Sequence, residues 1–276
     1  MKKTVYCLAI LFLLVSCNPD GKDHEECSLD ALKKYSTSAE KVTIKDRLGN
    51  KIIYPYEQTK SGVFIEGDIK VGEGKLTPKS LIRVGKTWTD GIVYYTIDSS
   101  IDDNDVDDIE DAIEHWQDKT GGEIVFKKRV SESNYVEFIK DDGCWSQVGM
   151  MGGKQNISLD DGCGLPQAIH EIGHALGLWH EQGRADRDEY VEILWCNITE
   201  DKRYNFLQVG SKGSDSGSYD YDSIMHYTKY AFSNNAQATL KSITSTSLPL
   251  FHPNKLSKGD TEGIACLYGY GTCDYE

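Results

Sequence analysis

The segment Leu165–Glu181 limits what this chain can fold into more than any other, because it holds three of the seven histidines within eleven residues. His170 and His174 are four residues apart, so on a helix they lie on the same face and can bind one zinc ion at about 2.0–2.1 Å. Gly177 can adopt a positive φ and end that helix. The turn would bring His180 to the metal from another side. We therefore expect a helix with two zinc ligands and a following turn with the third.

Glu171 directly follows the first of these ligands, which suggests catalysis. Three protein nitrogens leave one zinc position open for water, and the metal lowers the pKa of that water to around 7. Glu171 can accept the water's proton and pass it to a leaving amine. The alternatives are a surface histidine pair without metal and a zinc-binding protein without catalysis. The complete pattern H-E-x-x-H-x-x-G-x-x-H argues against the first, and Glu171 argues against the second.

The composition excludes one large class of partners. The formal net charge of −14 would repel phosphate backbones, and the sequence contains no run of Lys and Arg of the kind that binds nucleic acid. We expect no nucleic-acid partner. The length of 276 residues, with 39% hydrophobic content, favours one main domain behind a removable leader.

The N-terminus is typical of an export signal, predicted here as residues 1–17. Lys2 and Lys3 precede an apolar run, Val5–Val15, that is too short for a permanent membrane helix. The run leads into Leu14–Cys17, which resembles the lipobox of bacterial lipoproteins, so Cys17 could carry a lipid anchor. The alternative is an ordinary signal with a coincidental cysteine. Both place the mature protein outside the cytoplasm, at the cell surface, in the outer membrane or secreted, where disulfides persist.

Residues 18–80 are predicted to be a tether and propeptide, and residues 81–276 a catalytic domain. The propeptide carries short β-prone runs at 51–54 and 63–65, too few for a stable domain alone, and Gly72–Ser80 is typical of an exposed linker. In the catalytic part we expect a helix at 102–119 and strands at 91–97, 124–126, 135–139 and 155–159. Strands with helices between them indicate an α+β fold with a mixed sheet.

The zinc motif, together with Ser223–Tyr227, resembles the metzincin metalloproteases and, among them, the astacin family. Glu181 directly follows the third histidine, and Arg184–Asp188 resembles the family's R-P-D-R-D run. Tyr227 stands two residues after Met225. The similarity covers about residues 84 to 270.

This resemblance implies a two-lobed catalytic domain with the zinc helix at the floor of a cleft. Met225 would form an apolar base beneath the ligands. Tyr227 would be a further zinc ligand that swings away to stabilise the tetrahedral intermediate. Glu181 would bind the new N-terminus after cleavage near residues 75–83, unless it is a plain surface carboxylate. A neighbouring metzincin branch, without a functional Tyr227, is the alternative.

The resemblance also implies an open edge strand at Gly152, Gly153, Lys154 and Gln155 that pairs with the extended backbone of a protein or peptide substrate. Such pairing gives endopeptidase activity without revealing a side-chain preference.

Precursors in the family carry an F-x-G-D motif whose aspartate binds zinc in place of water. The run Ile65–Ile69 resembles it, although Phe64 stands one place early. Asp68 is therefore a candidate inhibitory ligand, to be removed by an activating protease. Cys27 is the competing candidate, since a thiolate binds zinc strongly, unless it forms a disulfide.

Cys144 and Cys163 match a short disulfide of the family. Its longer disulfide is in doubt, because Glu123 stands in place of the first cysteine and only Cys273 resembles the second. The pairing of Cys196, Cys266, Cys273 and Cys27 stays open.

The sequence thus predicts an exported, astacin-like, zinc-dependent endopeptidase made as a latent zymogen. The rival of another class is a surface-anchored binding lipoprotein that keeps one zinc ion for stability alone.

Overall fold

The computed structural model describes residues 41–45, 51–73, 81–83, 85–208, 215–244 and 246–273. The predicted signal, the tether, Cys17 and Cys27 lie outside these residues. These described residues belong to one compact unit. None of the helices within the described ranges has the length and apolar character needed to cross a bilayer.

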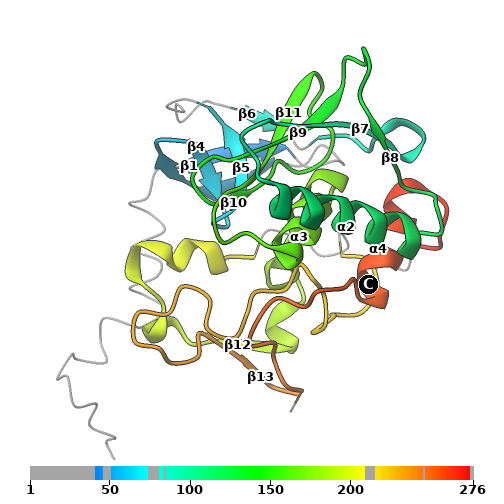
Figure 1. Ribbon diagram of the computed structural model, residues 1–276. Helices are drawn as coiled ribbons and strands as arrows, with labels where there is room; N and C mark the ends of the chain where they lie inside the picture. Colours follow the sequence, from blue (N-terminus) through cyan, green and yellow to red (C-terminus); the bar gives the residue numbers. More distant parts are fainter. Residues whose placement is uncertain are drawn as a thin grey trace, which may run out of the picture. The chain divides into compact units, whose positions relative to one another are not determined.

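A five-stranded sheet organises the catalytic part (Figure 1). Its strands, in spatial order, are β10 (Cys144–Trp145), β11 (Lys154–Leu159), β9 (Tyr135–Ile139), β7 (Ile92–Ile97) and β8 (Val125–Lys128). β10 is antiparallel to β11, and the other neighbours are parallel to each other. The predicted mixed sheet is confirmed.

The predicted substrate edge at Gly152–Gln155 falls at the start of β11. β11 lies inside the sheet, between β9 and β10, and the edge strand is β10. Gly152 and Gly153 precede β11 and have φ values of +90° and +73°, which belong to a turn. Gln155 is 2% exposed, and its side chain binds Met151 N at 2.9 Å and Gly149 O at 3.0 Å. β10 pairs only with Ser158 and Leu159 of β11, so Lys154 and Gln155 pair with β9 alone, and the substrate edge here stays a prediction.

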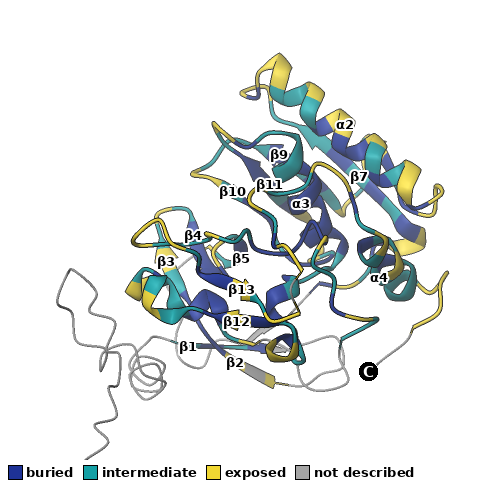
Figure 2. Ribbon diagram, turned by 90° about the horizontal axis from the view of Figure 1, so that it is seen from below, coloured by how far each residue is buried: buried dark blue, intermediate teal, exposed yellow. Residues whose placement is uncertain are grey.

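Two helices, α2 (Asp103–Lys119) and α3 (Leu165–Leu176), lie side by side against this sheet (Figures 1 and 2). The Asp102 side chain caps α2 by accepting from Asp105 N at 3.2 Å. The apolar face of α2 is buried, and Trp116 Nε1 donates to Ile169 O of α3 at 2.9 Å. This pairing fixes the zinc-motif helix in the main core.

The segment before the catalytic part forms two small three-stranded sheets, one of which includes a strand at the start of the predicted catalytic domain. One has the order β2-β1-β6, with β1 (Lys41–Lys45), β2 (Lys51–Pro55) and β6 (Leu81–Arg83). The other has the order β3-β4-β5, with β3 (Glu57–Thr59), β4 (Gly62–Ile65) and β5 (Ile69–Gly72). Their apolar side chains form a separate cluster that also takes in Val148 and Trp179 of the catalytic part. Packing against the catalytic part supplies the buried area that so short a segment lacks alone.

The remaining elements carry the loops around the site. β12 (Val191–Ile193) pairs with β13 (Leu240–Ser242), and α4 (Lys258–Tyr268) is the last helix among the described residues. The short 3₁₀ helices are η2 (Thr89–Gly91), η3 (Glu181–Gly183), η4 (Arg187–Glu189), η5 (Trp195–Asn197) and η6 (Glu200–Phe206).

Two disulfides are present among the residues that the structure describes. Cys144–Cys163 connects β10 to the loop before α3, as predicted. Cys266–Cys273 joins α4 to the residues that follow it, which resolves part of the open pairing. Cys196 is exposed in η5.

Candidate metal centre

The metal-motif helix ends where the sequence predicts. α3 runs from Leu165 to Leu176, and Gly177 follows it with a φ of +118°. The Gly177 amide donates to His174 O at 2.8 Å, which closes the last turn. A Cβ at Gly177 would stand 2.8 Å from Leu267 Cδ2, so both the backbone conformation and the space favour glycine here. The turn carries the chain back toward His180.

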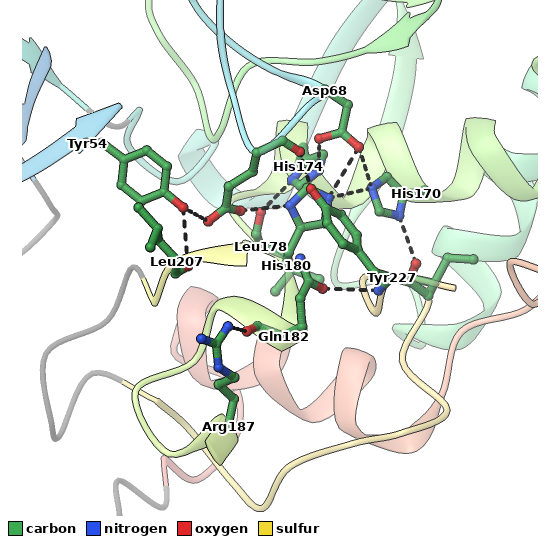
Figure 3. A network of polar contacts seen from close by, with 12 residues as sticks. Tyr54, Asp68, His170, His174, Leu178, His180, Gln182, Arg187, Leu207 and Tyr227 are labelled. Carbon is green, nitrogen blue, oxygen red and sulfur yellow. Dashed lines mark hydrogen bonds and ion pairs between the residues drawn. The ribbon is translucent and has the colours of Figure 1, made fainter. Parts of the chain in front are cut away.

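Three histidines and one carboxylate converge at one buried point (Figure 3). His170, His174, His180 and Asp68 each offer a ligand atom, and these atoms all lie within 4.8 Å of one another. Asp68 Oδ2 is 3.2 Å from His180 Nε2 and 3.5 Å from His170 Nε2, and Asp68 Oδ1 is 3.6 Å from His174 Nε2. The turn between β4 and β5 delivers Asp68. The zinc-motif helix and the aspartate of the predicted propeptide therefore meet.

The outer nitrogen of each imidazole has its own acceptor. His170 Nδ1 lies 2.8 Å from Ile224 O, and His174 Nδ1 lies 2.8 Å from Leu178 O. His180 Nδ1 lies 2.7 Å from Glu66 Oε2. Since each acceptor is an oxygen, each Nδ1 carries the proton, and each Nε2 is left to bind a metal.

Buried polar atoms without partners test whether a metal fits. Asp68 Oδ1, His174 Nε2 and Glu171 Oε2 are buried and have no hydrogen-bond partner among the described residues. Leaving such atoms unpaired costs about 1–3 kcal/mol each. A cation among the Nε2 atoms would satisfy the first two, and three imidazoles with one carboxylate oxygen are a donor set suited to zinc. The residues fit the metal.

The pKa shifts of Asp68 and His180 also favour a cation at this centre. Burial raises the pKa of Asp68, but the positive charge of His180 and hydrogen bonds from three imidazoles outweigh it and hold that pKa well below its ordinary value. Burial lowers the pKa of His180, but the carboxylates of Asp68 and Glu66 raise it to about 10. The protein therefore favours positive charge at this point, and a divalent cation can replace the proton.

Glu171 lies beside the ligands on α3 and is 2% exposed. Burial, and then the negative charge of Asp68, raise its pKa well above the ordinary value. A carboxyl with a raised pKa takes up a proton more readily and can pass it to a leaving amine.

Met225 packs directly beneath the helix. It is 2% exposed, and a Cβ added at Gly173, between the two helical ligands, would stand 2.7 Å from Met225 Sδ. Asp260 holds the preceding turn, because its oxygens accept from Ser223 Oγ at 2.6 Å and from Ile224 N at 3.0 Å. The same Ile224 supplies the carbonyl that orients His170.

Tyr227 also reaches the centre. Its ring lies 4.7 Å from that of His180, and its hydroxyl donates to the main-chain carbonyl of Glu66. Burial raises the pKa of Tyr227 well above the ordinary value, so it is a neutral donor. In this state the hydroxyl is bound to the segment predicted as the propeptide.

Glu181 is largely buried, with a side chain 15% exposed. Its Oε1 accepts from Asp220 N at 2.7 Å and lies 3.6 Å from Arg184 Nε. Burial raises the pKa of Glu181 to about 8 despite the guanidinium of Arg184. It is not the plain surface carboxylate of the alternative interpretation.

Two residues at the centre were missed from the sequence. Glu66 is 0% exposed and binds His180, which lies 114 positions further along the chain. His252 lies with its ring 5.2 Å from that of His170, and burial lowers its pKa to about 4. Nothing in a single sequence indicates either contact.

A family model described as Astacin, a peptidase family, matches residues 80–269. The chain therefore belongs to the astacin family. Enzymes of the astacin family are zinc-dependent, and the group of three histidines and Asp68 could hold one such ion.

Several relatives show the same similarity. Zinc metalloproteinase nas-6 of Caenorhabditis elegans is 37% identical over 199 residues, which are 68% of this chain and 57% of that protein. Meprin A subunit beta of Mus musculus is 42% identical over 180 residues, which are 63% of this chain and 25% of that protein. The chain thus spans little more than half of the first relative and a quarter of the second.

A solved structure agrees with the fold. High choriolytic enzyme 1 of Oryzias latipes (medaka fish), a hatching enzyme zinc-protease, matches with a TM-score of 0.61 and 34% identity. The match covers 67% of this chain and 94% of that one. The astacin-like α+β fold predicted from the sequence is confirmed.

Proposed function

We propose that this chain is the latent precursor of an exported zinc endopeptidase that hydrolyses peptide bonds in proteins or peptides. The observation that carries the proposal is the convergence of three imidazoles and Asp68 at one buried point, with Glu171 beside them. We keep the predicted boundaries, with a signal at 1–17, a propeptide and tether at 18–80 and a catalytic domain at 81–276.

His170, His174 and His180 would hold the zinc ion, which when bound polarises the scissile carbonyl and acidifies a water molecule. Glu171 accepts the proton of that water and donates it to the leaving amine. Once the propeptide has left, the Tyr227 hydroxyl is free to donate to the developing oxyanion. Its neutral state, maintained by burial that raises its pKa, supports that role.

Latency follows from what the propeptide occupies. Asp68 takes the position that water needs, and the Glu66 carbonyl binds the Tyr227 hydroxyl. Cys27, the competing ligand, lies outside the described residues. An activating protease would remove both obstacles. Glu181 is largely buried, and its carboxylate has the amide donor Asp220 N and, further away, the guanidinium of Arg184. It is then available to bind the new N-terminus.

The propeptide also occupies the edge of the sheet. Lys70 N donates to Ser146 O at 2.7 Å, and Ser146 N donates to Asp68 O at 3.1 Å. Ser146 directly follows β10, the edge strand. Its released main-chain groups can pair with an extended substrate backbone. We propose this edge in addition to the one predicted at Gly152–Gln155.

Export is supported by the two disulfides, which persist in oxidising compartments. A lipid anchor at Cys17 is proposed from the sequence alone.

Casein hydrolysis by the processed chain tests the activity. We expect Glu171→Ala and a zinc chelator each to abolish hydrolysis, while Glu192→Ala, an exposed glutamate paired with Lys241, leaves it unchanged. If Glu171→Ala retained full hydrolysis, the assigned base would be wrong. A zinc-loaded processed chain that cleaves nothing would favour the binding lipoprotein.

Latency has its own test. Unprocessed Asp68→Asn should cleave a small fluorogenic peptide faster than the unprocessed wild type, because the neutral amide binds zinc more weakly than a carboxylate. Glu57→Gln, which removes a propeptide carboxylate bound to Lys202 Nζ at 2.6 Å, is the control and should stay latent. An Asp68→Asn precursor as inactive as the wild type would transfer the role to Cys27 or another group.

A further inference from the structure

We infer that Glu66 is a second metal-site carboxylate of the precursor, which acts through His180, so that the propeptide holds the zinc ion in place as well as blocking it. Asp68 would bind the metal directly, and Glu66 would orient the third ligand and increase its basicity. The inference rests on the proposed function, since it needs a zinc ion at this centre.

The outer contacts of the three histidines differ in origin. His170 and His174 donate to the main-chain carbonyls of Ile224 and Leu178, which belong to the catalytic part and stay after processing. His180 donates to the carboxylate Glu66 Oε2, at 2.7 Å, which belongs to the propeptide. A carboxylate acceptor stabilises positive charge on the imidazole more than a carbonyl does. The third ligand therefore depends on a group that processing removes.

The Glu66 carboxylate is held on both sides. Glu66 is 0% exposed, and its other oxygen, Oε1, accepts from Tyr54 Oη at 2.8 Å. Tyr54 is itself 1% exposed on β2, in the same propeptide (Figure 3). A buried carboxylate with one donor on each oxygen is fixed in position, and it offsets the charge of a zinc–imidazole group behind it.

The backbone at Glu66 is shaped for this contact. Glu66 has a φ of +50°, which is uncommon for a residue other than glycine, and Gly67 follows with a φ of +87°. A Cβ at Gly67 would stand 2.7 Å from Phe232 Cζ of the catalytic part. The turn thus enters the centre tightly, with Glu66 on one side of His180 and Asp68 on the other. Strained backbone of this kind persists where surrounding contacts enforce it.

Outer-shell partners of metal-bound histidines change metal affinity by about 10- to 100-fold when they are altered. We therefore expect the precursor to lose that much affinity when Glu66 loses its charge. Processing removes Glu66 and Asp68 together, so the processed chain should release zinc more readily than the precursor.

The experiment measures zinc affinity, not activity, in the full chain with Glu171→Ala to prevent self-cleavage. Zn²⁺ is titrated in competition with a fluorescent chelator, and Co²⁺ absorption reports the ligand set. The test variants are Glu66→Gln, which keeps the side-chain shape, and Tyr54→Phe, which removes the donor that fixes the carboxylate. Asp68→Asn is the direct-ligand comparison. Glu57→Gln is the matched control, since Glu57 is a propeptide carboxylate bound to Lys202 and Tyr204 away from the metal.

Glu66→Gln should weaken Zn²⁺ binding by about 10- to 100-fold and leave the Co²⁺ bands unchanged, because the four direct ligands remain. Tyr54→Phe should weaken binding in the same direction but less. Asp68→Asn should change the Co²⁺ bands, and Glu57→Gln should change neither measurement. A folded Glu66→Gln precursor that binds Zn²⁺ as tightly as its parent overturns the inference. A parent that binds no stoichiometric zinc overturns the proposed function instead.

Discussion

His226 gives a prediction whose size can be worked from the structure. It is 0% exposed and lies between Met225 and Tyr227. Tyr219 Oη donates to its Nε2 over 2.7 Å, and its Nδ1 donates to Tyr227 O over 2.6 Å. In the neutral imidazole Nδ1 donates and Nε2 accepts, so both ring nitrogens are satisfied. Burial lowers the pKa of His226 to about 4 from the ordinary 6.5.

The number of protons that each state binds determines how the free energy of unfolding changes with pH. The unfolded chain protonates this histidine near pH 6.5 and the folded chain only near pH 4, so between these values the unfolded state binds more protons. The neutral imidazole is therefore compatible with full stability above pH 6.5, and stability falls as the pH drops toward 4. At about 1.4 kcal/mol per pKa unit, the loss amounts to about 3 kcal/mol.

Urea unfolding, followed by tryptophan fluorescence at several pH values, measures this loss. The chelator-treated chain avoids acid release of zinc, and His226→Gln removes the titrating group while keeping a side-chain donor. The free energy of unfolding of the wild type should fall by about 3 kcal/mol more than that of the variant between pH 7 and pH 4. Because His252 and the other histidines titrate in both proteins, they cancel. Parallel curves for the two proteins would refute the reasoning.

Other predictions concern packing, cross-linking and turnover. Gly173→Ala should lower the free energy of unfolding in urea by about 1–3 kcal/mol, because its Cβ would stand 2.7 Å from Met225 Sδ. The control Gly263→Ala, whose Cβ would be 3.7 Å from Leu178 Cδ2, should not lower it. Equal effects of the two variants would contradict the close packing at Gly173. Cys163→Ser should lower the free energy of unfolding by about 3 kcal/mol, because the lost disulfide spans 19 positions, and an unchanged urea midpoint would argue against it. Tyr227→Phe in the processed chain should lower kcat by about 100-fold with little change in KM, and an unchanged kcat would favour a neighbouring metzincin branch.

The local part of the site could be predicted because helix geometry determines it. Residues four apart on α3 lie on one face, and a glycine at 177 permits the turn, so the sequence predicted the placement of His170, His174 and His180. The strands and the other helix were predictable because hydrophobic periodicity is also a local property of the sequence. The runs at 91–97, 135–139 and 155–159 correspond to β7, β9 and β11, and the helix at 102–119 to α2.

The order of strands in a sheet is not local, so the sequence alone could not place the edge. The residues 152–155 suggested an open edge, but whether a strand has one or two neighbours depends on partners elsewhere in the chain. β9 pairs with Lys154–Ser158 of β11, whereas β10 pairs only with Ser158 and Leu159.

Glu66 was missed for a related reason. It stands two residues before Asp68, but a carboxylate in a turn is usually solvated. Only the packing of β4 and β5 against the catalytic part brings it to His180. Cys266 and Cys273 were left open because four cysteines allow several pairings, although the two are only seven positions apart.

Zinc K-edge X-ray absorption of the purified, unprocessed chain tests the central claim most directly. We expect one zinc ion per chain, bound by three imidazole nitrogens at about 2.0–2.1 Å and one carboxylate oxygen. A sulfur ligand at about 2.3 Å would show that a cysteine, and not Asp68, completes the site. A chain without stoichiometric zinc would contradict the account altogether.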